Sequence, residues 1–513
     1  VETRPVLKDK YDDHGLKNTT GKTVGTETVE VDGTINIGKY AKESSGIFAK
    51  DRGSITLKNN SEATTSSSDA NVVANLNKGI GTINVGGEKN YGAVVDGIEY
   101  KSKQKNAQNQ YEIESATNDK IGRIDLEKGT SINVTGKESI GYVMKKGAGS
   151  NSGKIDVVGH SNNNTTGGFH GSLGFYGEKG TFTNTADGTI SSSGNIAHAV
   201  AIIGDSTNGF TFKNQGRINV VGAGNIGVYA EGKYDFTHEN DGSSENALIS
   251  ASLGGVGIYA KNNTGTLNIN APIYVGNSTS TATTIGVYSD GDAKVVFKPN
   301  ANLVIRTGAV GLYSADVLKF GSTFTVPGAS NKLNVDLGTN STLGLFNDNN
   351  TKTITAGTYL NALKLNITNF GTGASLFYTT GGAKTEIDQD YTVSNVTAGG
   401  NSSTSILVGT KGSTVKVNNT KKLTTGTNVG LIATKGTGIG AASSTALNEG
   451  TIESTRTNSG IAIYTNDSVG TNSTTGVISM KGASAVGILG ENNSILTNDG
   501  KIELEENKSA GIY

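Results

Sequence analysis

The sequence has 513 residues, of which 73 are Gly and 4 are Pro, and it contains no Cys and no Trp. A hydrophobic content of 34% is too low for the three or four separate globular cores that this length would otherwise favour. The 44 basic and 45 acidic residues nearly cancel, which excludes bulk attraction to nucleic acid and argues against wholesale disorder. The lack of Cys excludes disulfides, thiolate metal sites and cysteine nucleophiles.

The first 32 residues lack a clear copy of the repeats found further along the chain. We expect residues 1–32 to cap the first coil of a solenoid, because an uncovered end would invite edge pairing. The start, VETRPVLKDK, shows neither Met nor the apolar region of a signal peptide. No apolar run reaches the roughly 18 residues of a membrane-spanning helix. We therefore expect this chain to be a segment of a longer protein.

A short alternating phrase recurs from residue 33 onwards. Its copies in chain order are GTINIG (33–38), GTINVGG (81–87), SGKIDVVG (152–159), QGRINVVG (215–222), EGTIESTR (449–456) and DGKIELEE (499–506). In QGRINVVG, Ile218 and Val220 share one face and Asn219 the other, which is typical of a strand buried on one side. Turn residues separate the copies, and no stretch has a sustained helical period, so we expect an all-β fold.

A second phrase combines a small residue or Gly with two apolar residues and often Tyr. Clear copies are SIGYVMKKG (139–147), NIGVYAEG (225–232), GVGIYAKN (255–262), TIGVYSDG (284–291) and AVGLYSAD (309–316), and degenerate ones lie at 198–205, 375–382 and 405–412. The spacing is mostly about 24 to 33 residues, within the range of solenoid repeats. We therefore predict a single-stranded parallel β-helix of about 17 coils over residues 33–513, ending within a truncated copy at SAGIY.

Stacked coils predict ladders of equivalent side chains. Ile, Val and Leu should point inward, Gly and Asn should occupy corners with positive φ, and Asn should bond its counterparts above and below. Outward positions should be mostly Asn, Ser and Thr. The repeat tyrosines should form a partly buried ladder with surface hydroxyls, although a sugar-stacking platform is an alternative. These tyrosines are Tyr229, Tyr259, Tyr288, Tyr313 and Tyr464, and the same phase elsewhere is assigned to Phe346, Ala433 and Leu489.

Three insertions interrupt the repeat, at 58–78, 97–120 and 159–171. Such insertions map to loops on one face of a solenoid, where binding is more common than on the scaffold. The basic run in the second insertion could contact phosphate or sulfated glycan, although a solvated loop is the simpler interpretation. The candidate ligand-binding residues are Tyr100, Lys101, Lys103, Lys105, Tyr111, His160, Phe169 and His170.

Catalytic motifs are weak throughout the sequence. Asp205 and Ser206 lie in IIGDSTNG, which contains the Gly-Asp-Ser string of serine proteases but lacks the glycines that follow the nucleophile. The His residues show no metal-binding spacing. We therefore expect no enzyme, no catalytic residues, no metal and no cofactor. A polysaccharide-active β-helix enzyme remains an alternative, and so does a stalk that binds nothing.

The phrases QGRINVVG, NIGVYAEG and GIYAKN together resemble the passenger region of the large fusobacterial type V autotransporter adhesins, the RadD-like and galactose-binding group. The resemblance covers roughly residues 33–513. It implies a right-handed parallel β-helix held at the bacterial cell surface by a C-terminal outer-membrane β-barrel that is absent from this chain. The implied function is adhesion to other bacteria, host receptors or host glycans. We expect a monomer that binds no nucleic acid.

Overall fold

The computed structural model describes residues 2–3, 28–31, 33–50, 54–58, 81–97, 102–105, 111–114, 122–161, 171–204, 209–242, 245–263, 265–279, 282–348, 352–393, 404–426, 428–437 and 441–513. Strands hold 59% of these residues and helices 4%. The chain forms two compact units, residues 1–249 with 263–265 and residues 250–262 with 266–513. Most of the expected cap at 1–32 and of the three expected insertions lies outside the described residues.

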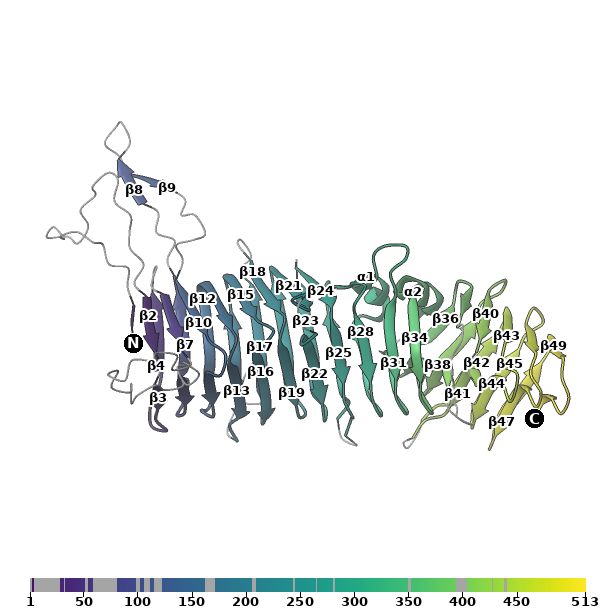
Figure 1. The fold of residues 1–513 in the computed structure, drawn as a ribbon. Coiled ribbons are helices and arrows are strands. Elements are labelled where there is room, and N and C mark those ends of the chain that lie inside the picture. The colour runs from purple at the N-terminus through teal and green to yellow at the C-terminus, as the bar shows by residue number, and fades with distance from the viewer. Residues whose placement is uncertain are drawn as a thin grey trace, which may run out of the picture. The chain divides into compact units, whose positions relative to one another are not determined.

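The first unit is built from three ladders of parallel strands, each ladder receiving one strand from successive coils (Figure 1). Ladder A holds β1 (Glu2–Thr3), β4 (Ser45–Lys50), β7 (Tyr91–Asp96), the first part of β12 (Ile140–Asn151), β14 (Ser172–Gly177), β17 (Ala197–Gly204) and β20 (Ile226–Gly232). Ladder B holds β2 (Thr28–Val31), β5 (Ser54–Leu57), β10 (Arg123–Leu126), the second part of β12, β15 (Gly180–Asn184), β18 (Phe210–Asn214) and β21 (Tyr234–Glu239). Ladder C holds β3 (Thr34–Ile37), β6 (Thr82–Val85), β11 (Ser131–Val134), β13 (Lys154–Gly159), β16 (Thr189–Gly194) and β19 (Arg217–Val221).

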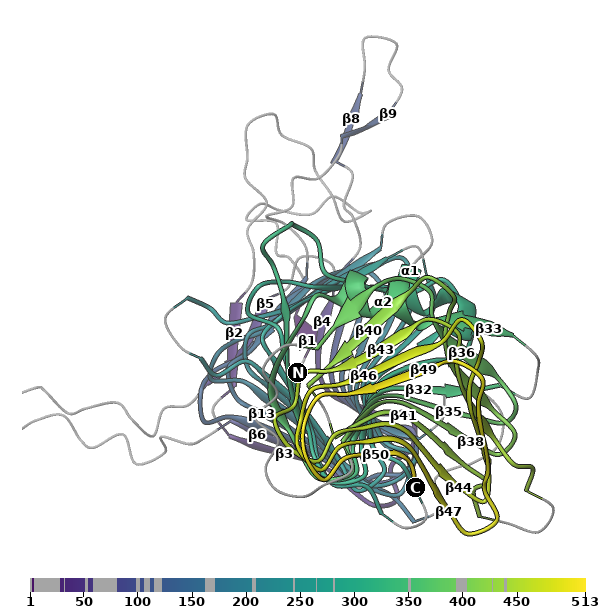
Figure 2. The same ribbon diagram turned by 90° about the vertical axis from the view of Figure 1, so that its right-hand side faces the viewer.

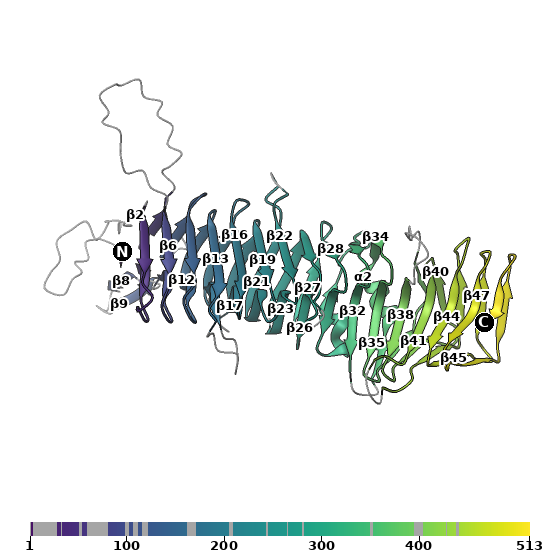
Figure 3. The ribbon, with the colours of Figure 1, turned by 90° about the horizontal axis from the view of Figure 1, so that it is seen from below.

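Ladder C follows the predicted alternation closely. Its strands β13, β16 and β19 lie side by side in Figure 3. In β19, Ile218 and Val220 are buried while Asn219 is half-buried on the other face, as predicted. The alternating pattern of β-branched and polar residues thus sets both the strand and its register. This arrangement is an all-β parallel β-helix, which confirms the predicted fold class.

The core of the first unit contains a column of aromatic rings. The ring centroid of Phe175 lies 4.2 Å from that of Phe182 and 5.3 Å from that of Phe212. Tyr142 lies in the same column, and its hydroxyl donates a hydrogen bond to the Ile124 carbonyl at 2.9 Å. Because all these rings are buried, a core only a few side chains wide still excludes water.

A buried ladder of Asn side chains lies at the end of ladder B, as predicted. Asn151 Nδ2 donates to Asn184 Oδ1 at 2.8 Å, and Asn184 Nδ2 donates to Asn214 Oδ1 at 2.7 Å. Asn214 Nδ2 then lies 3.0 Å from Nδ1 of the buried His238. Each amide thereby has a partner in the next coil, which satisfies polar groups that burial would otherwise penalise.

The second unit is also a parallel β-helix, with five ladders (Figure 2). Ladder A of this unit holds β23 (Val256–Asn263), β26 (Ile285–Asp290), β29 (Val310–Ser314), β32 (Thr342–Asn347), β35 (Ser375–Thr380), β38 (Ser405–Thr410), β41 (Val429–Thr434), β44 (Ile461–Asn466), β47 (Val486–Glu491) and β50 (Ala510–Ile512). Ladder B holds β24 (Thr266–Asn270), β27 (Lys294–Phe297) and β30 (Phe324–Thr325), and ladder C holds β25 (Pro272–Val275), β28 (Asn302–Ile305), β31 (Leu333–Leu337) and β34 (Leu365–Phe370). Ladder D holds β33 (Thr353–Thr355), β36 (Lys384–Ile387), β39 (Thr414–Val417), β42 (Thr445–Asn448), β45 (Val469–Asn472) and β48 (Ile495–Asn498), and ladder E holds β37 (Tyr391–Thr392), β40 (Lys422–Thr425), β43 (Thr451–Ser454), β46 (Val477–Met480) and β49 (Lys501–Leu504). Strand β22 (Leu248–Ser252) spans the boundary between the units in the sequence.

Short helices interrupt the second unit where ladders D and E replace ladders B and C. They are the 3-10 turn η3 (Val317–Lys319), α1 (Phe320–Thr323) and α2 (Ala356–Leu363). These short helices are compatible with the predicted all-β fold class, which expected no sustained helical period. Tyr359 of α2 stacks on Phe320 at 5.4 Å, and Phe320 also meets Phe377 at 5.6 Å. Tertiary contact with this aromatic cluster stabilises a helix too short to be stable alone.

Residues at the corners of the coils have positive φ angles, but few of them are Asn. Gly224 and Gly308 lie at such corners as predicted, whereas Lys89 (φ 54°), Glu138 (φ 48°) and Ile196 (φ 46°) occupy others. The prediction that Gly and Asn take these positions is thus only partly correct. A left-handed conformation costs an ordinary residue about 1 kcal/mol, which the hydrogen bonds of the flanking coils offset.

Candidate binding surface

In the first unit the outward side of ladder A differs from the outward sides of ladders B and C. In β10, β15 and β18 the outward residues are polar, such as Arg123, Thr181 and Lys213. On ladder A they are mainly Ile, Val, Leu and Tyr in two rows, which we call face A. The expectation of outward Asn, Ser and Thr is therefore wrong for this ladder. The side chains of face A are buried or half-buried, so the strip is close-packed and only part of it meets solvent. Apolar strips on the outward side of a ladder are nevertheless typical of binding surfaces.

The two rows of face A are defined by the strand register. In the first unit they are Tyr91, Ile140, Leu173, His198 and Ile226, and Val94, Val143, Tyr176, Ala201 and Tyr229. In the second unit they are Val256, Ile285, Val310, Thr342, Ser375, Ser405, Val429, Ile461 and Val486, and Tyr259, Tyr288, Tyr313, Leu345, Tyr378, Val408, Ile432, Tyr464 and Leu489.

Tyrosines on face A form the predicted partly buried ladder. The rings of Tyr259 and Tyr288 stack at 4.6 Å with an interplanar angle of 7°, and those of Tyr288 and Tyr313 stack at 4.8 Å. Tyr464 donates its hydroxyl hydrogen bond to Glu491 at 2.7 Å. Because stacked rings cover one another's faces, this part of face A presents ring edges and hydroxyls to solvent, which favours the ladder over the sugar-stacking platform.

Burial keeps these hydroxyls protonated. The pKa of Tyr288 is raised by burial first, and then by the nearby Tyr313 and Asp290. Burial likewise raises the pKa of Tyr464, and its hydrogen bond to Glu491 raises it further. At neutral pH Tyr288 and Tyr464 are therefore uncharged, and Tyr464 acts as a hydrogen-bond donor to Glu491.

The strand register corrects two of the predicted phases. Tyr313 pairs with Leu345, so Phe346 points inward and is fully buried. Tyr464 pairs with Ile432, so Ala433 is not its equivalent. Leu489 does pair with Tyr464, as predicted. Both errors are one-residue slips, which sequence spacing alone does not prevent where both flanking residues are apolar.

Glycine ahead of the aromatic row is required by a close approach between coils. A Cβ built on Gly141 would lie 2.7 Å from the carbonyl oxygen of Gly174 and 3.0 Å from Cγ2 of Ile155. Ile140 is half-buried on the outward side, whereas Tyr142 is fully buried and bonded in the core. Small residues here therefore create two adjacent apolar faces, one inside and one outside.

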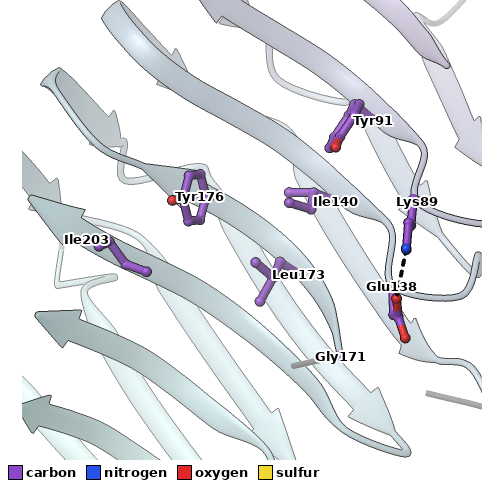
Figure 4. Close-up of a pocket in the computed structure, with 8 residues that line it drawn as sticks. All are labelled: Lys89, Tyr91, Glu138, Ile140, Gly171, Leu173, Tyr176 and Ile203. Atoms are coloured by element: carbon purple, nitrogen blue, oxygen red, sulfur yellow. Dashed lines mark ion pairs between the residues drawn. The ribbon is translucent and has the colours of Figure 1, made fainter. Parts of the chain in front are cut away.

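Face A of the first unit is hollowed, as Figure 4 shows. The hollow has a volume of about 360 Å³ and crosses β7, β12, β14 and β17. Ile140 and Leu173 lie between Tyr91 and Tyr176 in Figure 4. The complete lining is Lys89, Tyr91, Glu138, Ile140, Gly171, Leu173, Tyr176 and Ile203. Sequence reasoning missed this hollow, which forms between side chains of four different strands.

The structure brings three of the predicted ligand-binding residues onto one hairpin. Strands β8 (Ser102–Lys105) and β9 (Tyr111–Glu114) pair antiparallel within the second insertion, with Lys105 opposite Tyr111 and Lys103 opposite Ile113. His160 follows β13, and its carbonyl oxygen accepts a hydrogen bond from Asn195 Nδ2 at 3.5 Å. Tyr100, Lys101, Phe169 and His170 lie outside the described residues. The candidate site at these insertions thus stays a prediction.

No model of a known family matches the chain, and no curated protein matches it. Within the described ranges, no helix is long and apolar enough to cross a membrane. The same residues contain no group of three or more His, Cys, Asp or Glu side chains placed to hold a metal ion.

Proposed function

We propose that this chain is an adhesin scaffold that binds protein or glycan partners without catalysis. The observation that carries the proposal is face A, an outward apolar and tyrosine-containing strip kept in register over successive coils. An inward-facing apolar set would suffice for folding alone, so the outward one has a second use. The proposal includes the resemblance stated above, with display outside a bacterial cell and other bacteria, host receptors or host glycans as partners.

This proposal differs from the sequence-based prediction in the surface it uses. The three insertions at 58–78, 97–120 and 159–171 remain candidates for contact with partners. Face A adds a surface that belongs to the scaffold, where the register holds each side chain in place without the cost of ordering a loop. A rigid surface of this kind supports many weak contacts in a row, which together give high avidity.

The test measures adherence of the purified chain to partner bacteria, host cells and glycan arrays. A face A variant carries Ile285→Lys and Ile461→Lys, both at half-buried outward positions. A matched control carries Val296→Lys and Val304→Lys, which are also half-buried and outward but lie on ladders B and C. We expect the face A variant to lose adherence and the control to keep it.

Two outcomes would contradict the proposal. If both variants adhere like the parent chain and adherence disappears when the three insertions are deleted, the insertions are the binding surface. If the parent chain binds none of the cells or arrays, this segment is a stalk whose role is reach.

A further inference from the structure

Tyr176 borders the hollow on face A of the first unit, at a point where the row of tyrosines is interrupted. Tyr176 pairs with Val143 in one neighbouring coil and with Ala201 in the other. Both neighbours are too small to cover its ring, in contrast to Tyr288, which is stacked on both sides. No aromatic ring in the described part of the chain lies against Tyr176. The ring of Tyr176 is thus available to a ligand.

The floor of the hollow is aliphatic. Ile140, Leu173 and Ile203 contribute it, and Tyr91 stands at the opposite side from Tyr176 (Figure 4). Aliphatic carbon offers no hydrogen-bond partner, so a saccharide would leave its hydroxyls unpaired on this surface. An apolar group would instead be transferred from water to carbon contacts on three sides.

Charge at the margin is arranged asymmetrically. Lys89 is paired with Glu138 at 4.0 Å, so these two nearly cancel. Glu178 accepts the hydroxyl hydrogen bond of Tyr176 at 3.0 Å, and no cation pairs with it among the described residues. Burial and Glu178 both raise the pKa of Tyr176, which stays neutral. The margin beside Tyr176 therefore presents a carboxylate that makes no ion pair among the described residues. Lys179 follows it in the chain, and Lys145 follows Met144, whose carbonyl accepts the Glu178 N–H.

We propose that this hollow is an anchor site for one apolar side chain of a protein partner, next to a basic residue of that partner. The aliphatic floor and the open Tyr176 ring take the apolar group, and Glu178 attracts the adjacent cation. Anchors of this kind carry most of the affinity of a protein interface. The inference rests on the proposed adhesive function for its biological meaning, but the site can be measured without any adherence assay.

Small probes test the site on the full chain. Phenethylamine, 2-phenylethanol and 3-phenylpropionate present the same ring with a cation, a neutral group and an anion, and methyl β-galactopyranoside represents sugars. Ligand-observed NMR should give dissociation constants in the low millimolar range for the aromatic probes, since fragments of this size gain little per atom. We expect phenethylamine to bind about 2–5-fold more tightly than 2-phenylethanol, as for a partly exposed ion pair. The propionate should be the weakest aromatic probe.

Variants assign the binding to the hollow. Tyr176→Ala should weaken all aromatic probes at least about fivefold, while Glu178→Gln should remove only the preference for the cation. The matched control is Tyr464→Ala, since Tyr464 has the same place in its strand and the same type of bond to an acid. If Tyr176→Ala misfolds, Ala201→Tyr provides a second test, because it extends the stacked row and fills the space.

Three results would overturn the anchor site. They are binding of the galactoside but not the aromatic probes, aromatic binding that survives both Tyr176→Ala and Ala201→Tyr, and no detectable binding of any probe. Each of these leaves the adherence experiment on Ile285 and Ile461 unaffected, so failure of the anchor site is distinguishable from failure of the adhesin proposal.

Discussion

Asn184 offers a direct measure of what burial adds to an Asn ladder. It is fully buried, accepts from Asn151 Nδ2 at 2.8 Å and donates to Asn214 Oδ1 at 2.7 Å. Asn184→Ala removes both bonds and leaves a buried donor and a buried acceptor without their closest partners. At about 1–3 kcal/mol for each orphaned group, we expect a local destabilisation of about 3–4 kcal/mol.

Asn84 is the matched control for this substitution. It also donates to one neighbour, Asn36 Oδ1 at 2.7 Å, and accepts from another, Asn133 Nδ2 at 2.9 Å. On the outward face of ladder C, Asn84 and Asn133 are only half-buried and Asn36 is exposed, so water replaces the lost partners. Asn84→Ala should therefore cost about 0.5–1 kcal/mol.

Hydrogen exchange followed by mass spectrometry is the suitable assay, because stability in a repeat array is local. Each factor of ten in the exchange rate corresponds to about 1.4 kcal/mol. Backbone amides of β15 should therefore exchange several hundred times faster in Asn184→Ala, and the exchange of β6 amides should be about 2–5-fold faster in Asn84→Ala. An equal increase in the exchange rate at both sites would refute the argument that burial, and not the number of hydrogen bonds, determines how much an Asn ladder stabilises the fold.

Three further substitutions probe the core, the coil contacts and the charged surface. Burial raises the pKa of Tyr142 in the folded chain, so above about pH 10 the unfolded chain loses the Tyr142 proton more readily and the folded state loses stability. Tyr142→Phe should therefore reduce the fall in stability to urea that occurs above about pH 10. Gly141→Ala should destabilise its coil by about 1–3 kcal/mol in hydrogen exchange, since the new Cβ would lie 2.7 Å from a carbonyl oxygen. The pKa of Glu453 is lowered by Lys422 and Lys481, so its carboxylate stabilises the folded chain above about pH 4.3, and this stabilisation is lost as the pH falls. Glu453→Gln should therefore cost about 0.5 kcal/mol in urea at pH 7, with a difference that disappears near pH 3.

The fold was predictable because the inward pattern is simple and repeated. Ile218 and Val220 alternate with Asn219, and the same alternation recurs at a spacing that only stacked coils explain. The helix α2 was not predictable, since its eight residues are too few for a period and depend on Tyr359 meeting Phe320. Local pattern thus identifies the elements, while contacts between coils decide the exceptions.

Face A shows why outward features are harder to derive than inward ones. In the segment from Ile140 to Met144 the outward Ile140 and Val143 and the inward Tyr142 and Met144 are all apolar, so composition does not separate the two faces. Their assignment requires the pairing with neighbouring coils, which also leaves no room for a side chain at Gly141.

Predicting the hollow from the sequence is harder still than predicting face A. Neither Val143 nor Ala201 is unusual within its own strand. Only the register sets both beside Tyr176 and so leaves its ring without an aromatic neighbour at the edge of the hollow. A surface site on a β-helix is therefore a property of columns across coils, and changes at single positions in separate repeats can create or close it without altering the core. This independence allows one scaffold to present different anchor sites along the same face.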